Sequence, residues 1–116
     1  MNGSPERGNV ALDVPVRISR RDAPIIPTER WREVSGALVK RYDFMREQDR
    51  TRFVSGLMEY EADVGHHALI AIRANVVELR VNTENVDRPT ELDKEYAAFA
   101  DILHRDVVYA STWEEA

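Results

Sequence analysis

The chain has 116 residues, no cysteine and a net charge of −5, and hydrophobic residues make up 43% of it. This length fits one domain with its own core, and the lack of cysteine excludes disulfides, thiolate catalysis and cysteine-ligated zinc. The acidic net charge argues against non-specific nucleic-acid binding. No apolar run reaches the ~18 residues of a membrane span, and the first residues lack a signal-peptide pattern. We therefore expect a soluble cytoplasmic protein.

The first 27 residues are set apart by proline, glycine and arginine. They hold four of the five prolines and a net charge of +1, while the other 89 residues carry −6. Such a stretch cannot run as helix and predicts an extended arm. Because apolar residues are spaced along it, we expect the part from Arg17 to Ile26 to lie against its own domain or a partner. The alternative, a disordered leader, stays open.

The domain is predicted to begin with a β-hairpin. Residues 31–34 form a short strand candidate, Ser35-Gly36 is a turn signal, and residues 37–44 alternate in polarity. Three apolar residues of this second strand share one face: Leu38, Tyr42 and Phe44. Lys40 interrupts that face, so we expect it to lie at an edge of the sheet.

The apolar residues after this hairpin recur at helical steps. Their spacing of four, three and four predicts a helix from about residue 46 to residue 64. The stripe consists of Phe53, Leu57, Tyr60 and Val64. Gly65 follows as a typical residue for a helix C-terminus, and His66 and His67 stand directly after it.

Two more strands and a second helix complete the pattern. Residues 69–72 and 76–81 predict strands joined at Ala74-Asn75, and the second strand turns its odd-numbered residues inward. Thr90 opens a start like a capping box for a helix to about His104. The stripe of this helix is Leu92, Tyr96, Phe99 and Leu103. The order strand, strand, helix, strand, strand, helix predicts an α+β fold, a four-stranded antiparallel sheet with two helices packed on one face.

These elements divide the chain into three parts. We expect an extended or disordered arm over residues 1–27, a domain over residues 28–105 and a C-terminal tail over residues 106–116, which is expected to be disordered. A four-stranded sheet leaves two edges to cover, so we expect a homodimer or a small even-numbered oligomer. Residues 76–83 are apolar and lack proline, so nothing in that strand forbids pairing with a second copy.

The order of elements and the double histidine between the first helix and the third strand resemble the pterin-4a-carbinolamine dehydratase family. The resemblance runs from Trp31 to Leu103. It rests on Trp31, Phe44, His66-His67, Thr83 at the end of the fourth strand and Asp93 in the last helix. Members of the family have the fold predicted above and dehydrate a 4a-hydroxy-tetrahydropterin without a metal. The resemblance therefore implies no metal and no bound cofactor.

The family's active site is altered in this chain. Its pattern is an acidic residue, three positions, His-His-Pro, an aromatic residue and a third histidine at the end of the fourth strand. The chain departs from it at Ala62, Ala68, Ile70 and Glu84. An imidazole suits the protonation of a leaving hydroxide, whereas a carboxyl group needs strong desolvation to do so. We therefore expect no catalytic residue, with His66, His67, Glu84 and Asp93 marking a degenerate pocket.

Each of these residues also has a structural explanation. His66 and His67 follow a helix C-terminus, where the helix dipole favours a protonated imidazole by ~0.3–1 kcal/mol. Neighbouring strand residues point to opposite faces, which disfavours one shared metal ion. Asp93 fits the capping turn of its helix. His104 fits a surface position near the end of the same helix.

The altered pocket, the long arm and the segment TELDKEYA (residues 90–97) resemble a diverged branch of the family that accompanies α-carboxysome genes and acts as a Rubisco assembly factor. The resemblance implies a non-catalytic chaperone of the bacterial cytoplasm, associated with the carboxysome, that binds Rubisco subunits and neither nucleic acid nor a membrane. Two alternatives stay open. One is a residual pterin-4a-carbinolamine dehydratase, and the other is a protein-binding dimerisation cofactor for a transcription factor.

Overall fold

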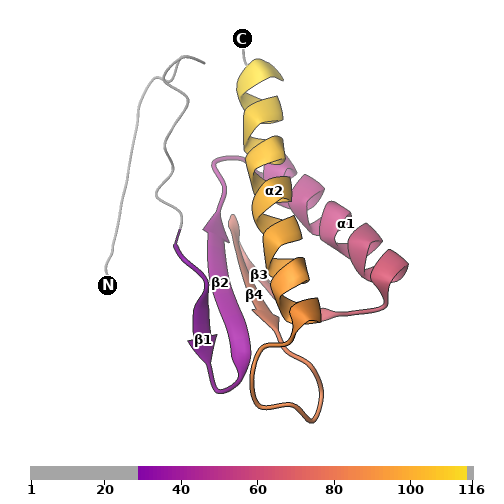
Figure 1. Ribbon diagram of the computed structural model, residues 1–116. Helices are drawn as coiled ribbons and strands as arrows, with labels where there is room; N and C mark the ends of the chain where they lie inside the picture. Colours follow the sequence, from indigo (N-terminus) through magenta and orange to yellow (C-terminus); the bar gives the residue numbers. More distant parts are fainter. Residues whose placement is uncertain (1–28, 115–116) are drawn as a thin grey trace.

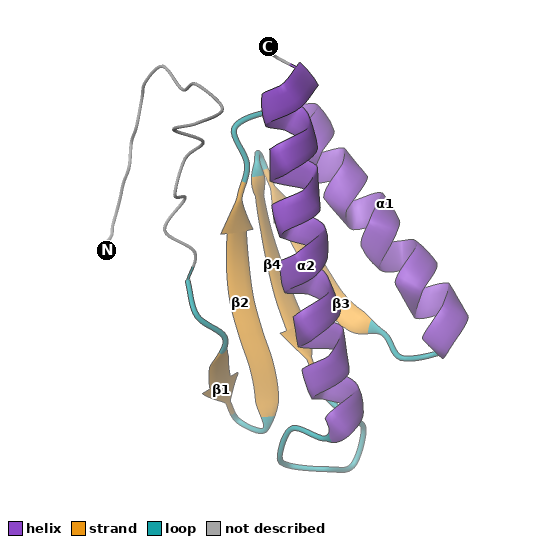
Figure 2. Cartoon of the chain, turned by 45° about the horizontal axis from the view of Figure 1, so that its top comes forward, coloured by secondary structure: helices purple, strands orange, loops and turns teal. Residues whose placement is uncertain are grey.

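The computed structural model describes residues 29–114, so the expected arm over residues 1–27 lies outside the described part of the chain. Six elements follow one another in the predicted order. Their bounds are Arg32–Val34 for β1, Ala37–Asp43 for β2, Glu47–Val64 for α1, Ala68–Arg73 for β3, Val76–Val81 for β4 and Glu91–Glu114 for α2. The predicted α+β fold is confirmed, because both helices lie on one side of a four-stranded sheet (Figures 1 and 2).

The sheet runs in the order β1-β2-β4-β3, and every neighbouring pair is antiparallel. The predicted hairpin between β1 and β2 turns at Ser35 and Gly36, which both have positive φ, as a type I′ turn requires. Gly36 is also required by space, because a Cβ there would come within 2.7 Å of the Asp87 backbone. Since β4 is flanked by β2 and β3, the strand considered for pairing with a second copy is already paired on both sides.

Lys40 does not lie at an edge of the sheet, so that expectation is wrong. It belongs to the inner strand β2, points to the helix-covered face opposite Leu79, and is only 5% exposed. Its ammonium group lies 2.7 Å from a carboxylate oxygen of Asp101 on α2. A buried charge is tolerated where such a partner replaces water. The alternation of residues along one strand cannot reveal a partner that lies on a distant helix.

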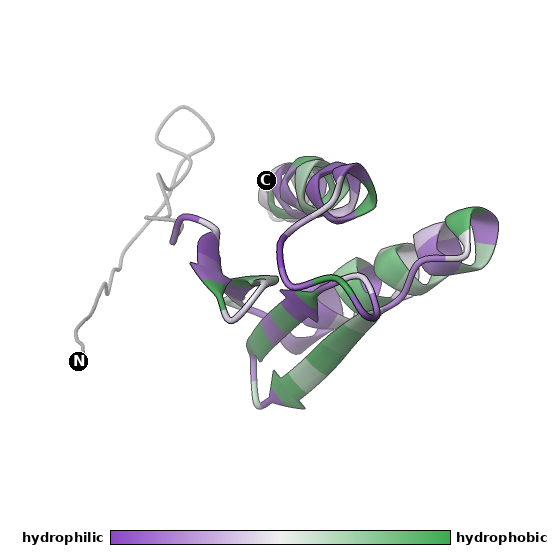
Figure 3. Cartoon of the chain, turned by 60° about the horizontal axis from the view of Figure 1, so that its bottom comes forward, coloured by the Kyte–Doolittle hydropathy of each residue, from purple (hydrophilic) through white to green (hydrophobic). Residues whose placement is uncertain are grey.

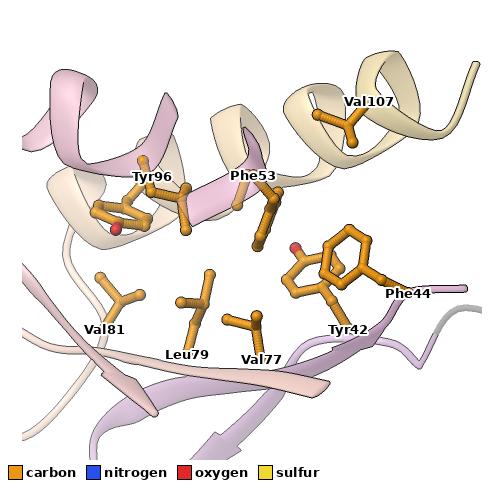
Figure 4. Close-up of a cluster of buried hydrophobic side chains, with 10 residues drawn as sticks. Tyr42, Phe44, Phe53, Val77, Leu79, Val81, Tyr96 and Val107 are labelled. Carbon is orange, nitrogen blue, oxygen red and sulfur yellow. The ribbon is translucent and has the colours of Figure 1, made fainter. Parts of the chain in front are cut away.

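The core lies between the sheet and the two helices (Figure 4). Val77, Leu79 and Val81 of β4 are fully buried and point toward the helices, as predicted. Phe53 of α1 and Tyr96 of α2 meet them from the other side. The buried cluster is completed by Tyr42, Phe44, Leu57, Ala100 and Val107. Because full burial of one large apolar side chain is worth about 1.5–3 kcal/mol, this cluster holds both helices on the same face.

α1 ends where the sequence predicts. Gly65 adopts the left-handed conformation (φ 71°), and its N–H donates to the Glu61 carbonyl at 2.8 Å. The buried stripe continues from Leu57 to Glu61, whereas Val64 is half-exposed. The expectation that Val64 closes the stripe is therefore wrong. The four-residue step from Phe53 to Leu57 repeats at Glu61, whose carboxylate finds hydrogen-bond donors inside the fold.

α2 is longer than predicted. It continues to Glu114, so the end expected near His104 is wrong, and residues expected to form a disordered tail are helical. Val107 and Ser111 are buried and extend the core-facing stripe at helical steps, which explains why the helix does not stop. In Figures 1 and 2 the last turns of α2 extend past the end of the sheet.

The start of α2 also differs from its predicted stripe. Leu92 is half-exposed, and Asp93 takes the fully buried position beside it.

Both helices carry apolar and polar residues around their axes (Figure 3), as expected of elements with one face on a core. In the part of the chain that the structure describes, no helix is both long and apolar enough to cross a membrane.

Candidate functional site

His66 lies in the short link between α1 and β3, and its ring reaches the first turn of α2. Its Nε2 atom is 2.7 Å from Oδ1 of Asp93, and the histidine side chain is 12% exposed. Gly65 makes this possible, because its left-handed conformation ends α1 and turns the chain toward the sheet. His67, the next residue, is exposed. The two adjacent imidazoles thus have different surroundings and do not converge on one point.

Asp93 is fully buried and accepts several hydrogen bonds. The Thr90 N–H donates to its carboxylate at 2.9 Å, and the Thr83 hydroxyl donates at 3.2 Å. Burial by itself would raise the pKa of Asp93, but the hydrogen bonds from Thr90, His66 and Thr83 outweigh it and hold that pKa below its ordinary value. The expected capping role is confirmed, since an acidic residue three positions after Thr90 bonds its backbone N–H.

The other expected pocket positions do not join this group. Glu84 lies in an exposed turn between β4 and α2. Ala68 and Ile70 belong to the edge strand β3, where both pack against the core cluster. The structure therefore brings together His66 and Asp93 and leaves His67 and Glu84 at the surface. Within residues 29–114, no three His, Cys, Asp or Glu side chains are arranged to hold a metal ion.

A second buried carboxylate, which the sequence reading passed over, lies close by on α1. Glu61 accepts a hydrogen bond from the Tyr96 hydroxyl at 2.5 Å and from the Ala68 N–H at 3.1 Å. Burial and the Glu61 carboxylate raise the pKa of Tyr96 far above its ordinary value, so this hydroxyl stays a donor. Glu61 therefore joins α1 to the start of β3 and to α2. The sequence contains one signal for the burial of Glu61, because it follows Leu57 by four residues and therefore lies on the same face of α1.

Asp101 forms a third polar group with residues that are distant in sequence. It accepts hydrogen bonds from Lys40 at 2.7 Å, from the Tyr42 hydroxyl at 2.6 Å and from the Trp31 indole at 3.2 Å. Burial and the neighbouring Asp101 carboxylate raise the pKa of Tyr42 strongly. Trp31, one of the residues that suggested the family, therefore fixes the beginning of the sheet to the middle of α2.

His104 is not at the surface, so that expectation is wrong. It is 6% exposed and its ring lies 4.9 Å, 5.3 Å and 6.0 Å, between centroids, from the rings of Tyr42, Phe44 and Phe53. Its Nε2 atom is buried without a hydrogen-bond partner among the described residues. Burial and the charge of Lys40 lower its pKa to about 4. His104 is thus a neutral core residue. It does not lie at a helix end, because α2 continues past it.

Replacement of Glu61 by alanine is expected to lower the free energy of unfolding by about 2 kcal/mol. The Tyr96 hydroxyl and the Ala68 N–H would lose their acceptor inside the fold, and an unsatisfied buried donor costs about 1–3 kcal/mol. Urea denaturation measures the change. Glu59→Ala, an exposed position on the same helix, is the matched control and is expected to stay within about 0.5 kcal/mol of the parent. Equal effects of the two substitutions would contradict the role of Glu61.

Comparison with known proteins agrees with this architecture. The family model for pterin 4 alpha carbinolamine dehydratase matches residues 17–103. A transcriptional coactivator/pterin dehydratase from Brucella melitensis has a TM-score of 0.61 and 22% identity, over 66% of this chain and 84% of that chain. A pterin dehydratase-like protein, identified as a RuBisCO assembly factor in the alpha-carboxysome, has a TM-score of 0.58 and 23% identity, over 66% of this chain and 90% of that one. No curated protein matches the chain.

Proposed function

Because the chain belongs to the pterin 4 alpha carbinolamine dehydratase family, we propose that it keeps the family's fold without its catalysis and acts as a Rubisco assembly factor of the α-carboxysome. The observation that carries the proposal is the state of the pocket. Of the three histidine positions, only that of His66 is bonded to another pocket residue, Asp93, whereas His67 and Glu84, which is in the position of the third histidine, are exposed. The similarity to a structure identified as a RuBisCO assembly factor supports the choice of partner.

The residues at the pocket positions lack much of what dehydration requires. The reaction expels hydroxide, so an acid must stand next to the leaving group while the flat pterin ring is held against a surface. Ile70 offers no aromatic face for the ring, and Ala68 removes the rigid turn that proline would give. Glu84 is exposed in the turn between β4 and α2, so it is not enclosed in a pocket beside a leaving group.

One observation favours residual dehydratase activity as the second candidate function. The 2.7 Å contact between His66 and an ionised, buried Asp93 orients one imidazole. A carboxylate that orients a histidine in this way supports general acid–base catalysis in other enzymes. This single pair could transfer a proton, but it provides neither a second imidazole nor a platform for the ring.

We expect no dehydration of a 4a-hydroxy-tetrahydropterin above the uncatalysed rate. The physical reason is the absence of two of the three expected imidazoles from one site. The measurement is the absorbance change of the pterin with and without protein, and His66→Ala serves as the control. A clear rate enhancement by the parent chain that disappears in His66→Ala would establish the dehydratase and overturn the non-catalytic proposal.

Co-expression tests the assembly function directly. Rubisco subunits are produced with and without this protein, and the amount of assembled, active holoenzyme is measured. We expect a higher yield with the parent chain and with His66→Ala, because the proposal gives the imidazole no part in assembly. An unchanged yield of holoenzyme in the presence of the soluble, folded protein would reject the proposal.

We also expect a homodimer that forms through β3. Within residues 29–114, no strand pairs with the outer side of this six-residue edge strand, Ala68–Arg73, whereas the other edge strand has only three residues. Ile72→Lys is expected to shift the protein toward monomer, because a lysine on an edge strand opposes edge-to-edge pairing. Light scattering at micromolar concentration measures the shift, and Met58→Lys on α1, also exposed, is the matched control. A stable monomer of the parent chain would contradict this prediction.

A further inference from the structure

The side of the sheet that faces away from the helices, called the open face below, carries a row of residues across all four strands. Arg32 lies opposite Val39, Val39 opposite Arg80, and Arg80 opposite Leu69. Arg80 alternates along β4 with the buried Leu79 and therefore points away from the core. The backbones of the two arginines thus stand two strands apart, about 10 Å, on this face, and Val39 between them is buried.

Two further arginines enlarge the basic area. Arg41 lies opposite Glu78 and is 3.6 Å from Asp43 on the same strand, whereas Arg73 lies opposite Val76. The open face therefore carries four arginines and two carboxylates, a net charge of +2. Among the described residues, no ion pair involves the three arginines at positions 32, 73 and 80. Arg80 donates a long hydrogen bond of 3.5 Å to the Val34 carbonyl, but none of the three has a carboxylate partner among the described residues.

The helical layer has the opposite charge. α1 and α2 together contain eleven acidic and four basic residues, a net charge of −7. The molecule is thus polarised across its thickness, with the acidic residues on the side that covers the core. Such a field attracts an anionic partner to the open face and repels it from the helices. The total charge of −5 conceals this separation.

An apolar side chain lies within the basic area. Leu69 is 66% exposed and stands directly opposite Arg80, and Ala71, two residues along the same face, is also exposed. Interfaces commonly combine an apolar anchor with a surrounding polar and charged rim. The open face offers this combination in one surface, with arginine forks that match carboxylates in geometry.

We propose that the open face binds an acidic, extended segment of another protein, whose carboxylates pair with Arg32 and Arg80 and whose apolar residue packs on Leu69. A segment in the polyproline II conformation covers about 9 Å in three residues and has three residues per turn, so acidic residues three positions apart lie on one side of it and match the two arginines.

Other occupants fit the open face less well. The first 28 residues of the chain hold four arginines and three acidic residues, so they do not complement a basic surface. A nucleic acid carries a charge at every phosphate, and it would bring some of these charges against Asp43 and Glu78. An acidic peptide can place uncharged residues at those two positions and carboxylates only at the arginines.

The test uses three fluorescent probes and fluorescence anisotropy with the full chain. The first probe is a twelve-residue peptide with glutamate at every third position and a central leucine, the second has glutamine in place of glutamate, and the third is a single-stranded oligothymidylate. We expect the full chain to bind the glutamate peptide about tenfold more tightly than the other two, and more weakly as salt rises. Absence of glutamate-peptide binding, or equal affinity for the oligonucleotide, would overturn the proposal.

Two matched double variants locate the binding surface. Arg32→Glu/Arg80→Glu reverses two charges on the open face, and Lys94→Glu/Arg105→Glu makes the same change in net charge on α2. The first is expected to weaken peptide binding at least about tenfold, and the second less than about twofold. Equal losses would show attraction by total charge alone and reject the site. If the first variant does not fold, as judged by circular dichroism, Arg32→Gln/Arg80→Gln replaces it, with Lys94→Gln/Arg105→Gln as its control and the same criterion.

Discussion

Replacement of Asp101 by asparagine is expected to lower the free energy of unfolding by about 3 kcal/mol. The carboxylate accepts hydrogen bonds from Lys40, Tyr42 and Trp31. Asparagine keeps the shape but removes the negative charge, which leaves the buried ammonium group of Lys40 without its counter-ion. Removal of one partner from a buried ion pair costs about 3–5 kcal/mol, and the partial exposure of Asp101 places the effect at the lower end.

The effect is measured by urea denaturation at neutral pH and low salt. Asp106→Asn, which removes an exposed carboxylate from the same helix, is the matched control and is expected to change stability by less than about 0.5 kcal/mol. Lys40→Met in the Asp101→Asn background is expected to recover part of the loss, because it removes the unpaired charge. Equal stability of the Asp101 and Asp106 variants would show that this ion pair does not support the fold.

Acidification is expected to destabilise the parent chain through His104. Burial and the charge of Lys40 place its pKa at about 4 in the folded state, against about 6.5 in an unfolded chain. As the pH is lowered below 6.5, the unfolded chain takes up the proton before the folded chain does. The free energy of unfolding therefore decreases as the pH is lowered, and it levels off below about pH 4. This group alone therefore accounts for a loss of about 2 kcal/mol between pH 7 and pH 5, and about 3 kcal/mol by pH 4.

A histidine-free core isolates this contribution. In His104→Phe an aromatic ring remains among Tyr42, Phe44 and Phe53, and the proton-binding site is gone, so the variant is expected to lose about 2 kcal/mol less than the parent between pH 7 and pH 5. His67→Gln is the control, because His67 is exposed and its replacement is expected to leave the pH dependence unchanged. Urea denaturation at both pH values gives the comparison. Parallel losses in the parent and His104→Phe would contradict a neutral, buried His104.

The predictable part of the fold came from local patterns. The alternation along β4 predicted its inward residues, because strand geometry sends successive side chains to opposite faces. Gly65 predicted the end of α1, because few other residues adopt the left-handed conformation that ends a helix. In each case the information lay within a few residues of the position in question.

The buried polar residues could not be predicted in the same way. Lys40 and Asp101 are 61 positions apart, and His66 and Asp93 are 27 apart, so neither residue of a pair has its partner within a local window. His104 looked like a surface residue because the buried residues that extend α2, Val107 and Ser111, are fewer and smaller than those before it. Polar residues on a buried stripe require the tertiary structure, which supplies their partners.

The position of Asp101 has a consequence for the nascent chain on the ribosome. All four strands are synthesised before α2, yet Lys40 and Tyr42 on β2 have their acceptor on α2. A nascent chain that ends after β4 would therefore have to leave these two polar groups hydrated, and the sheet could not close over them. Because α2 is translated after all four strands, the first half of the domain becomes stable only once α2 has left the ribosome and packed on the sheet.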